Sequence, residues 1–145
     1  MIRYERLQHQ FVHHIPTLLQ PGVLYVSMEY GTAAHSCCCG CGEEVVTPFT
    51  PTDWQMTFDG DAVSLWPSIG NWTLACRSHY FIEGGRVIEA YSWSDQEIEA
   101  GRRRDKAAKA RYYGTRRAST DESVQDAPQQ GRRSTIGHFV SQFWR

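Results

Sequence analysis

The sequence has no long apolar run. No segment approaches the roughly 18–20 consecutive apolar residues that a membrane-spanning helix needs, so the sequence argues against a transmembrane protein. The first residues, MIRYERLQHQFVHHIPTLLQPG, carry charged and polar groups where a signal peptide would have its apolar stretch. We therefore expect a cytoplasmic protein, and its 145 residues suit about one domain with a modest core.

Cysteines are few and unevenly placed. The chain has five of them, and four fall in the stretch HSCCCGCGEE, residues 35–44. Cys37, Cys38, Cys39 and Cys41 are too close in sequence to form disulfides with one another without strain. In a reducing cytosol, clustered cysteines more often bind a metal ion or act in catalysis than form disulfides. The cluster therefore predicts a metal site or a reactive thiol.

Basic residues are scarce in the first two thirds of the chain. Residues 1–101 carry 4 Lys and Arg against 12 Asp and Glu, a net charge of −8, whereas residues 102–145 carry 11 against 4, a net charge of +7. Much of this positive charge lies in GRRRDKAAKARYYGTRR, residues 101–117. The charge split indicates a compact acidic N-terminal domain followed by a basic appendage.

Short β-type runs separated by Gly, Pro, Asn and Asp occupy most of the N-terminal domain. Alternating residues at 54–58 and 62–66 flank an Asp-Gly turn signal and predict a hairpin, and Gly84–Gly85 marks a second one. GVLYVSMEYGTAAHSCC suits two extended segments broken at Gly31, and the two prolines of residues 43–54 confine that stretch to a sheet edge or a loop. The predicted fold class is mainly β, a small antiparallel sheet of hairpins, with a C-terminal helical extension.

The C-terminal third contains a predicted helix and two further segments. Ser94 and Glu97 fit a capping box ahead of sequence rich in Ala, Arg and Lys. Near the end of the chain, apolar residues fit one face of a short helix that docks on this chain, on a second copy or on another protein. We expect four regions: a β domain at 1–92, a basic helix at 93–114, a disordered linker at 115–133 and a short amphipathic segment at 134–145.

Four of the cysteines are candidate ligands of one metal ion. Cys37, Cys39 and Cys41 recur at every second position, so the first two can share one face of a strand. The Gly-Cys-Gly turn allows Cys41 to fold back beside them. Cys76, from a distant segment, would complete a tetrahedral set of four thiolates, the usual composition of a structural zinc site. We predict that structural Zn²⁺ stabilises the small β domain.

Several alternatives stay open at this site. His35 or His79 can replace one thiolate as the fourth ligand. Cys38 points the other way and is predicted to be a bystander, although it is the thiol to test for redox chemistry. Buried reduced cysteines without a metal are the remaining alternative.

Two serine–histidine pairs are candidates for catalysis, because a four-cysteine site leaves zinc no open position for substrate. His35 lies two residues before Cys37, and Ser78 lies two residues after Cys76. If these segments pair as antiparallel strands, His35 and Ser78 come opposite each other as base and nucleophile. A serine or a histidine in such a place can also serve only as a hydrogen-bonding group.

The second pair is Ser68 with His79. Ser68 lies in WPSIGNW, where proline and glycine suggest a shaped loop. The backbone amides of this loop, with Gly70 and Asn71 as candidates, are available to bind an oxyanion or to orient a catalytic group. His79 is next to Ser78 but on the other face of its strand, so it can serve Ser68.

Together, GTAAHSC, CGCG, PSIGNW and CRSHY make the sequence resemble a family of small bacterial proteins known as a domain of unknown function. Its members are encoded beside ubiquitin-like proteins and E1- and E2-like enzymes, in bacterial ubiquitination-like (Bub-type) operons linked to phage defence. The resemblance covers about residues 23–90 and leaves the basic tail outside. It implies a peptidase that trims the C-terminus of a ubiquitin-like protein or removes it from its conjugates, with the ubiquitin-like protein and the E1- and E2-like proteins as partners.

This resemblance implies acyl transfer by a serine–histidine mechanism. Ser68 or Ser78 would attack the carbonyl carbon, and His35 or His79 would take the hydroxyl proton and pass it to the leaving amine. Asn71 or Asp53 could be the orienting third member, since no carboxylate stands out in the sequence. A metallopeptidase with an open zinc site is the first alternative.

A non-catalytic adaptor is the second alternative. The basic stretch at 101–117 has eight Lys and Arg and two tyrosines, so it offers phosphate contacts and stacking to a nucleic acid, or charge to an acidic protein. No base-reading motif is present, and a solvated helix surface explains the same residues. We therefore expect protein partners rather than nucleic acid, and no membrane.

Overall fold

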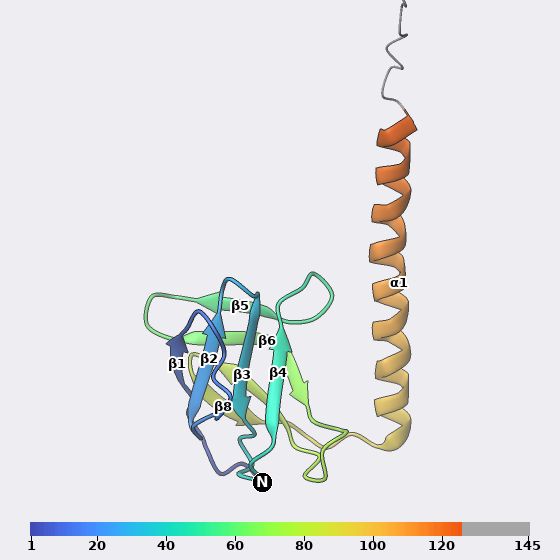
Figure 1. Cartoon of the computed structure of the whole chain (residues 1–145). Coiled ribbons are helices and arrows are strands. Elements are labelled where there is room, and N and C mark those ends of the chain that lie inside the picture. The colour runs from blue at the N-terminus through green and yellow to red at the C-terminus, as the bar shows by residue number, and fades with distance from the viewer. Residues whose placement is uncertain (126–145) are drawn as a thin grey trace, which may run out of the picture. The chain divides into compact units, whose positions relative to one another are not determined.

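The computed structural model describes residues 1–125, with side chains to residue 120. Two four-stranded sheets, in the orders β1-β2-β3-β4 and β5-β6-β7-β8, precede one helix, α1, so the chain is mainly β with a helical extension, as predicted (Figure 1). None of the helices in these residues is long and apolar enough to cross a membrane. The elements are β1 (Gln8–Phe11), β2 (Val23–Ser27), β3 (Thr32–Ser36), β4 (Glu44–Pro48), β5 (Gln55–Phe58), β6 (Val63–Gly70), β7 (His79–Glu83), β8 (Arg86–Glu89) and α1 (Asp95–Gln125).

The first sheet contains one pairing that the sequence did not indicate. β2 and β3 are the two predicted extended segments and pair antiparallel, and β4 is an edge strand, consistent with the prolines around it. β1, however, runs parallel to β2, with Gln8 opposite Val23 and Phe11 opposite Val26. The short segment QHQF has no alternating apolar pattern, and a parallel pair is joined by a crossover rather than a turn signal. The predicted antiparallel pairing therefore holds for the other strands, and β1 adds one parallel pair.

The second sheet is a run of three antiparallel hairpins with an irregular β6. Asp59 accepts hydrogen bonds from the amides of Asp61 and Ala62 and thereby closes the β5–β6 turn. Between the pairs Leu65–Ile82 and Ile69–Tyr80, three residues of β6 lie opposite one residue of β7. Such a bulge accommodates a proline within a sheet and redirects nearby side chains. Ser68 is one of the three bulged residues.

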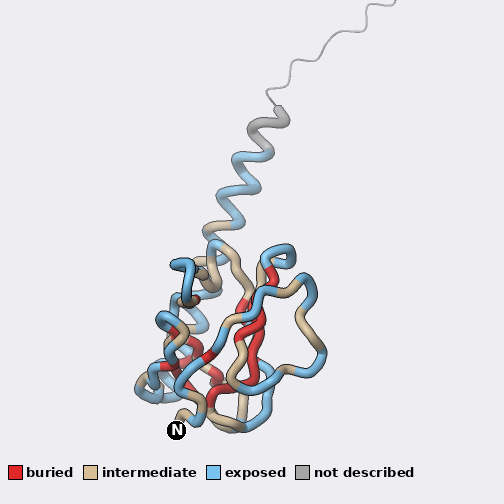
Figure 2. The backbone as a smooth tube through the Cα atoms, turned by 90° about the vertical axis from the view of Figure 1, so that its left-hand side faces the viewer, coloured by how far each residue is buried: buried red, intermediate tan, exposed pale blue. Residues whose placement is uncertain are grey.

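The core lies between the two sheets, whose strands run in crossing directions in Figure 1. Figure 2 shows the buried segments at the centre of the β part. Side chains of both sheets contribute to one cluster, and Val26, Tyr80 and Ile82 within it are completely buried. Burying this apolar surface is the main favourable contribution to folding, at about 25 cal/mol per Å².

The helix α1 begins with the predicted capping box. The Glu97 carboxylate accepts a hydrogen bond from the Ser94 amide at 2.7 Å, and the Ser94 hydroxyl accepts one from the Glu97 amide at 3.3 Å. Ile98 is buried beside the β domain. The helix continues past the expected end at residue 114, through part of the expected linker, to Gln125. The remainder of the linker and the segment 134–145 lie outside the described residues.

Candidate active site and metal centre

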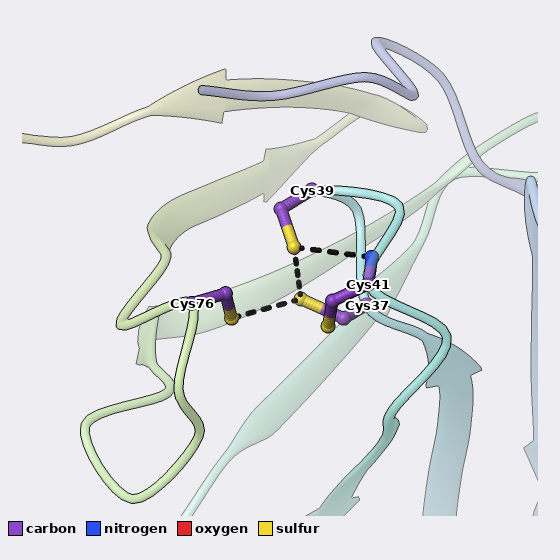
Figure 3. Close-up of side chains that lie close together, drawn as sticks. All are labelled: Cys37, Cys39, Cys41 and Cys76. Carbon is purple, nitrogen blue, oxygen red and sulfur yellow. Dashed lines mark hydrogen bonds between the residues drawn. The ribbon is translucent and has the colours of Figure 1, made fainter.

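Four cysteine sulfurs lie close together at one end of the β domain. The Sγ atoms of Cys37, Cys39, Cys41 and Cys76 all lie within 4.8 Å of one another, and Figure 3 shows the side chains converging from two separate loops. Cys37 Sγ is 3.5 Å from Cys39 Sγ and 3.9 Å from Cys76 Sγ. All of the cysteines are free thiols. The four residues are those that the spacing predicts as metal ligands.

A tight turn after β3 gathers three of these cysteines. β3 ends at Ser36, so Cys37 and Cys39 lie in the turn and not on one face of a strand, as the spacing had suggested. The Gly40 amide donates to the Cys37 carbonyl at 3.0 Å, and Gly40 adopts a φ of 87°, which glycine tolerates without strain. The amide of Cys41 donates to Cys39 Sγ at 3.3 Å.

A second turn brings in Cys76. The loop between β6 and β7 is closed by hydrogen bonds from the Leu74 amide to the Asn71 carbonyl and from the Arg77 amide to the Leu74 carbonyl, both 3.1 Å. Arg77 holds a φ of 47°, in the left-handed region that costs a non-glycine residue about 1 kcal/mol or more. Its guanidinium makes an ion pair with Asp95 at 2.9 Å. The turn therefore presents Cys76 to the other three cysteines.

The donor set fits a zinc ion. Zn–S bonds of about 2.3 Å in a tetrahedron place the sulfurs about 3.8 Å apart, close to the observed separations. Burial raises the pKa of Cys39 to about 12 and also raises the pKa of Cys41. Burial also opposes ionisation of Cys76, but hydrogen bonds from Ser78 outweigh it and lower its pKa to about 7. Several neighbouring thiolates need a cation to offset their repulsion, and zinc would supply it.

Cys38 is not a member of this group. Its side chain is completely buried in the core cluster, and its carbonyl accepts the amides of Arg3 and Tyr4 at 2.8 and 3.0 Å. Burial raises the pKa of the Cys38 thiol to about 12. A buried thiol of this kind is chemically inert, which argues against the redox alternative.

A chain of buried polar groups joins the cysteine cluster to the core. Ser78 Oγ lies 3.1 Å from Cys37 Sγ and accepts a hydrogen bond from Asn71 Nδ2 at 2.9 Å. Asn71 Nδ2 also donates to the Tyr80 hydroxyl at 3.4 Å, and that hydroxyl lies 2.7 Å from His35 Nε2. Burial lowers the pKa of His35 to about 4, so its ring is neutral near neutral pH. Its Nδ1 is buried and has no hydrogen-bond partner in the part of the chain that the structure describes.

We predict that Tyr80→Phe destabilises the fold by about 1–3 kcal/mol, because it leaves His35 Nε2 buried without its partner and removes one of the acceptors of the Asn71 amide. Urea unfolding measures this change. Tyr25→Phe is the matched control: Tyr25 is also buried, but its hydroxyl accepts a single part-buried bond from the Gln20 amide, so about 1 kcal/mol or less is expected. Equal losses in the two variants would contradict the role given to the buried chain.

Ser68 and His79 form a second polar pair, on the bulged part of the second sheet. Ser68 Oγ lies 2.8 Å from His79 Nε2, and His79 Nδ1 lies 2.7 Å from the backbone carbonyl oxygen of Tyr91. A carbonyl oxygen only accepts, so the Nδ1 proton of His79 must point at Tyr91. The neutral ring then has an unprotonated Nε2 that accepts the Ser68 hydroxyl proton. This tautomer is the one that a general base requires.

Aromatic rings surround the His79 ring, whose residue is only 6% exposed. The Trp72 ring centroid lies 4.9 Å away, and that of Trp93 lies 5.4 Å away in an edge-to-face arrangement. The two indoles stack on each other, with centroids 5.6 Å apart. These aromatic contacts hold the His79 ring in place beside Ser68.

A cavity of about 330 Å³ opens beside Ser68 and His79. One wall comes from the β domain and another from the start of α1, which contributes Ile98, Gly101 and residues that follow. Concave sites in which apolar walls meet convergent polar groups are typical of substrate sites. The lining residues of the β domain and of the segment before α1 are Thr52, Asp53, Trp54, Pro67, Ser68, Gly70, Trp72, His79 and Trp93.

Gly70 is required by the approach of Trp72. A Cβ atom on Gly70 would lie 2.3 Å from Trp72 Nε1. We predict that Gly70→Ala displaces this indole from the His79 ring and lowers kcat/KM by about tenfold or more, since small displacements of catalytic groups are costly. Gly114→Ala is the control, because an added Cβ meets nothing within 4 Å there. Near-UV circular dichroism measures the tryptophan environment, and unchanged spectrum and rate would contradict the prediction.

The other predicted site residues do not join the Ser68–His79 pair. His35 and Ser78 lie on segments of different sheets and, among the described residues, share no direct hydrogen bond. Asn71 contacts Ser78 rather than His79, and its amide is already donated to the Ser78 carbonyl at 2.8 Å. Asp53 lines the cavity, but its carboxylate is engaged by Lys109 at 2.7 Å and by Thr50.

The group that orients His79 is a backbone carbonyl, and the sequence offered no signal for it. Any residue at position 91 would present the same carbonyl. The Ala90 amide donates a hydrogen bond to the His79 carbonyl at 2.8 Å, and only this backbone pairing could have indicated that the Tyr91 carbonyl lies near the His79 ring.

Comparison with protein families gives one match. A family model described as "Bacterial ubiquitination-like system serine protease (BubE)" matches residues 11–90, which is more than half of the chain. The matched region contains the four clustered cysteines, Ser68 and His79 and ends just before Tyr91 and α1. No curated protein matches the chain. No solved structure matches it either.

Proposed function

The chain belongs to the BubE family, the serine proteases of bacterial ubiquitination-like systems, and on that premise we propose that Ser68 is the nucleophile and His79 the general base of a peptidase acting on a ubiquitin-like protein. The observation that carries this assignment is the line of hydrogen-bonded groups from Ser68 through His79 to the Tyr91 carbonyl, at 2.8 and 2.7 Å. Of the candidate serines, Ser68 has a histidine in position to accept its proton, and it lines the cavity.

The proposed reaction is acyl transfer. Ser68 Oγ attacks the carbonyl carbon of the last residue of the mature ubiquitin-like protein, while His79 Nε2 takes the hydroxyl proton. His79 then gives this proton to the leaving amine as the carbon–nitrogen bond breaks. Water, deprotonated by the same Nε2, hydrolyses the ester and restores Ser68. The Tyr91 carbonyl keeps the Nδ1 proton in place throughout and orients the ring.

The metal is assigned a structural role. Cys37, Cys39, Cys41 and Cys76 would hold Zn²⁺, and four thiolates complete its usual coordination, so the ion supplies rigidity and no reactive water. Ser78 contacts Cys37 and Cys76, and it precedes His79 directly. Zinc bound there would fix the end of the segment that carries the general base. This assignment ranks the metallopeptidase alternative below the serine mechanism.

The test is cleavage of a ubiquitin-like protein from such a system, extended at its C-terminus or joined to a target lysine. We expect the full chain to release the extension and to react with a fluorophosphonate at Ser68, identified by mass spectrometry of the labelled peptide. Comparison of the two substrate types separates maturation from deconjugation. Absence of both cleavage and labelling would favour the adaptor alternative, and labelling at Ser78 would reassign the nucleophile.

A further inference from the structure

The wall of the cavity formed by α1 lies outside the matched region of the family. That region ends at residue 90, whereas Ile98, Gly101, Arg102, Arg104 and Asp105 all line the cavity beside Ser68. A Cβ on Gly101 would lie 3.0 Å from the Trp93 ring, so helix and indole are closely packed here. The helix is thus placed to select among substrates.

The charges on this wall are not balanced by the protein. Arg102 and Arg104 make no ion pair within the described part of the chain. Two carboxylates line the cavity, and that of Asp53 forms an ion pair with Lys109. Burial disfavours the charge of Asp53, but its contacts with Lys109 and Thr50 outweigh burial and lower its pKa. The cavity lining therefore carries the two positive charges of Arg102 and Arg104 and one remaining negative charge, that of Asp105.

The cavity lining also includes buried hydrogen-bond donors. The indole nitrogens of Trp54 and Trp93 are buried and have no partner among the described residues. Guanidinium groups are donors only, with a planar arrangement that matches two carboxylate oxygens. A carboxylate supplied by a ligand would complement these donors.

We propose that Arg102 and Arg104 bind a carboxylate of the peptide that enters the cavity, and so make this peptidase selective for a cleavage site next to a negative charge. The inference rests on the proposed function, because it names a property of the substrate of Ser68. Two sources supply such a carboxylate: the free C-terminus of a short extension, or an aspartate or glutamate side chain near the cleaved bond. Both present the same two oxygens to the guanidinium groups.

The experiment measures binding, so that it does not depend on turnover. The full chain carrying Ser68→Ala is titrated with a ubiquitin-like precursor bearing a short extension in four forms. These end in a free carboxylate, in an amide, in an amide preceded by Glu, or in an amide preceded by Lys. The same titrations are repeated with Arg102→Gln and Arg104→Gln, singly and combined. Arg103→Gln is the control, because it matches each single variant in charge change and Arg103 does not line the cavity.

We expect the free carboxylate to bind about tenfold more tightly than the plain amide, the scale of one charge-assisted contact. The Glu form separates the sources: tight binding shows that a side chain suffices, and weak binding restricts recognition to the C-terminus. The double variant should remove the preference, and Arg103→Gln should keep it. Equal binding of acid and amide, or an equal effect of Arg103→Gln, would overturn the proposal. Wild-type cleavage of the amide form would leave the proposed function standing in that case.

Discussion

Replacing Ser68 with alanine is expected to abolish cleavage of a ubiquitin-like precursor, with a loss of at least about 10³-fold in kcat/KM. The substitution removes the atom that attacks the carbonyl, and it leaves the fold in place because Ser68 lies in a bulge at the cavity and not in the core. His79→Ala should lose a comparable factor, since an alcohol without a base is a poor nucleophile. The double variant should lose no more kcat/KM than either single variant, because Ser68 and His79 act as a unit.

Ser78→Ala is the control that discriminates between the two candidate serines. It removes the hydroxyl that contacts Cys37, Cys76 and Asn71, so we expect a loss of about 1–2 kcal/mol in stability with cleavage retained. Initial rates, fluorophosphonate labelling and thermal unfolding of each variant, measured at equal zinc content, separate the two effects. A folded Ser78→Ala protein without activity, beside an active Ser68→Ala protein, would transfer the nucleophile to Ser78.

The hairpins and the turn that carries Cys37, Cys39 and Cys41 were predictable because their signals are local. Asp-Gly and Gly-Gly dipeptides mark the turns at Gly60 and Gly84–Gly85, and the glycines around Cys41 indicate a turn that can gather thiols. The capping box at Ser94 is equally local. Each of these features depends on a few neighbouring residues, whose conformational preferences persist in the folded protein.

The features that escaped the sequence depend on contacts between distant segments. β1 pairs in parallel with β2, although nothing in its own residues marks a strand. The pairing of His35 with Ser78 required neighbouring strands, but β3 and β7 belong to different sheets, and the two residues communicate through Tyr80 and Asn71.

The geometry of the proposed catalytic pair also depends on strand register. Three residues of β6 lie opposite one residue of β7, and this mismatch sets where Ser68 lies relative to His79. The orienting group is a main-chain oxygen, that of Tyr91. Neither a register shift nor a main-chain acceptor leaves a residue-type signal, which explains why both candidate pairs had remained open.

Removal of the metal is the second change for which we expect a large effect. It should destabilise the fold, and activity should fall as a consequence. Zinc purified with the protein should be close to one ion per chain, and extraction by a chelator should lower the free energy of unfolding by about 5 kcal/mol or more, as for other structural zinc sites. The melting temperature should fall by more than roughly 20 °C. Cys37→Ser should lower the zinc content and the melting temperature in the same way, because Cys37 is the buried member of the group. Cys38→Ser, also buried but outside the group, is the control that should keep the zinc.

The loop between β6 and β7 links this loss of stability to activity. It carries Cys76 and the indole of Trp72, and it is followed directly by Ser78 and His79, so its release should disturb the stacking around His79 and slow cleavage. Refilling with Cd²⁺, which thiolates also bind, distinguishes a structural from a catalytic ion. A structural ion predicts that stability and kcat recover together and that Ser68 remains essential in the cadmium form. If the cadmium protein regained its melting temperature but not its activity, the metal would take part in the reaction and the four-thiolate site would have to open during turnover.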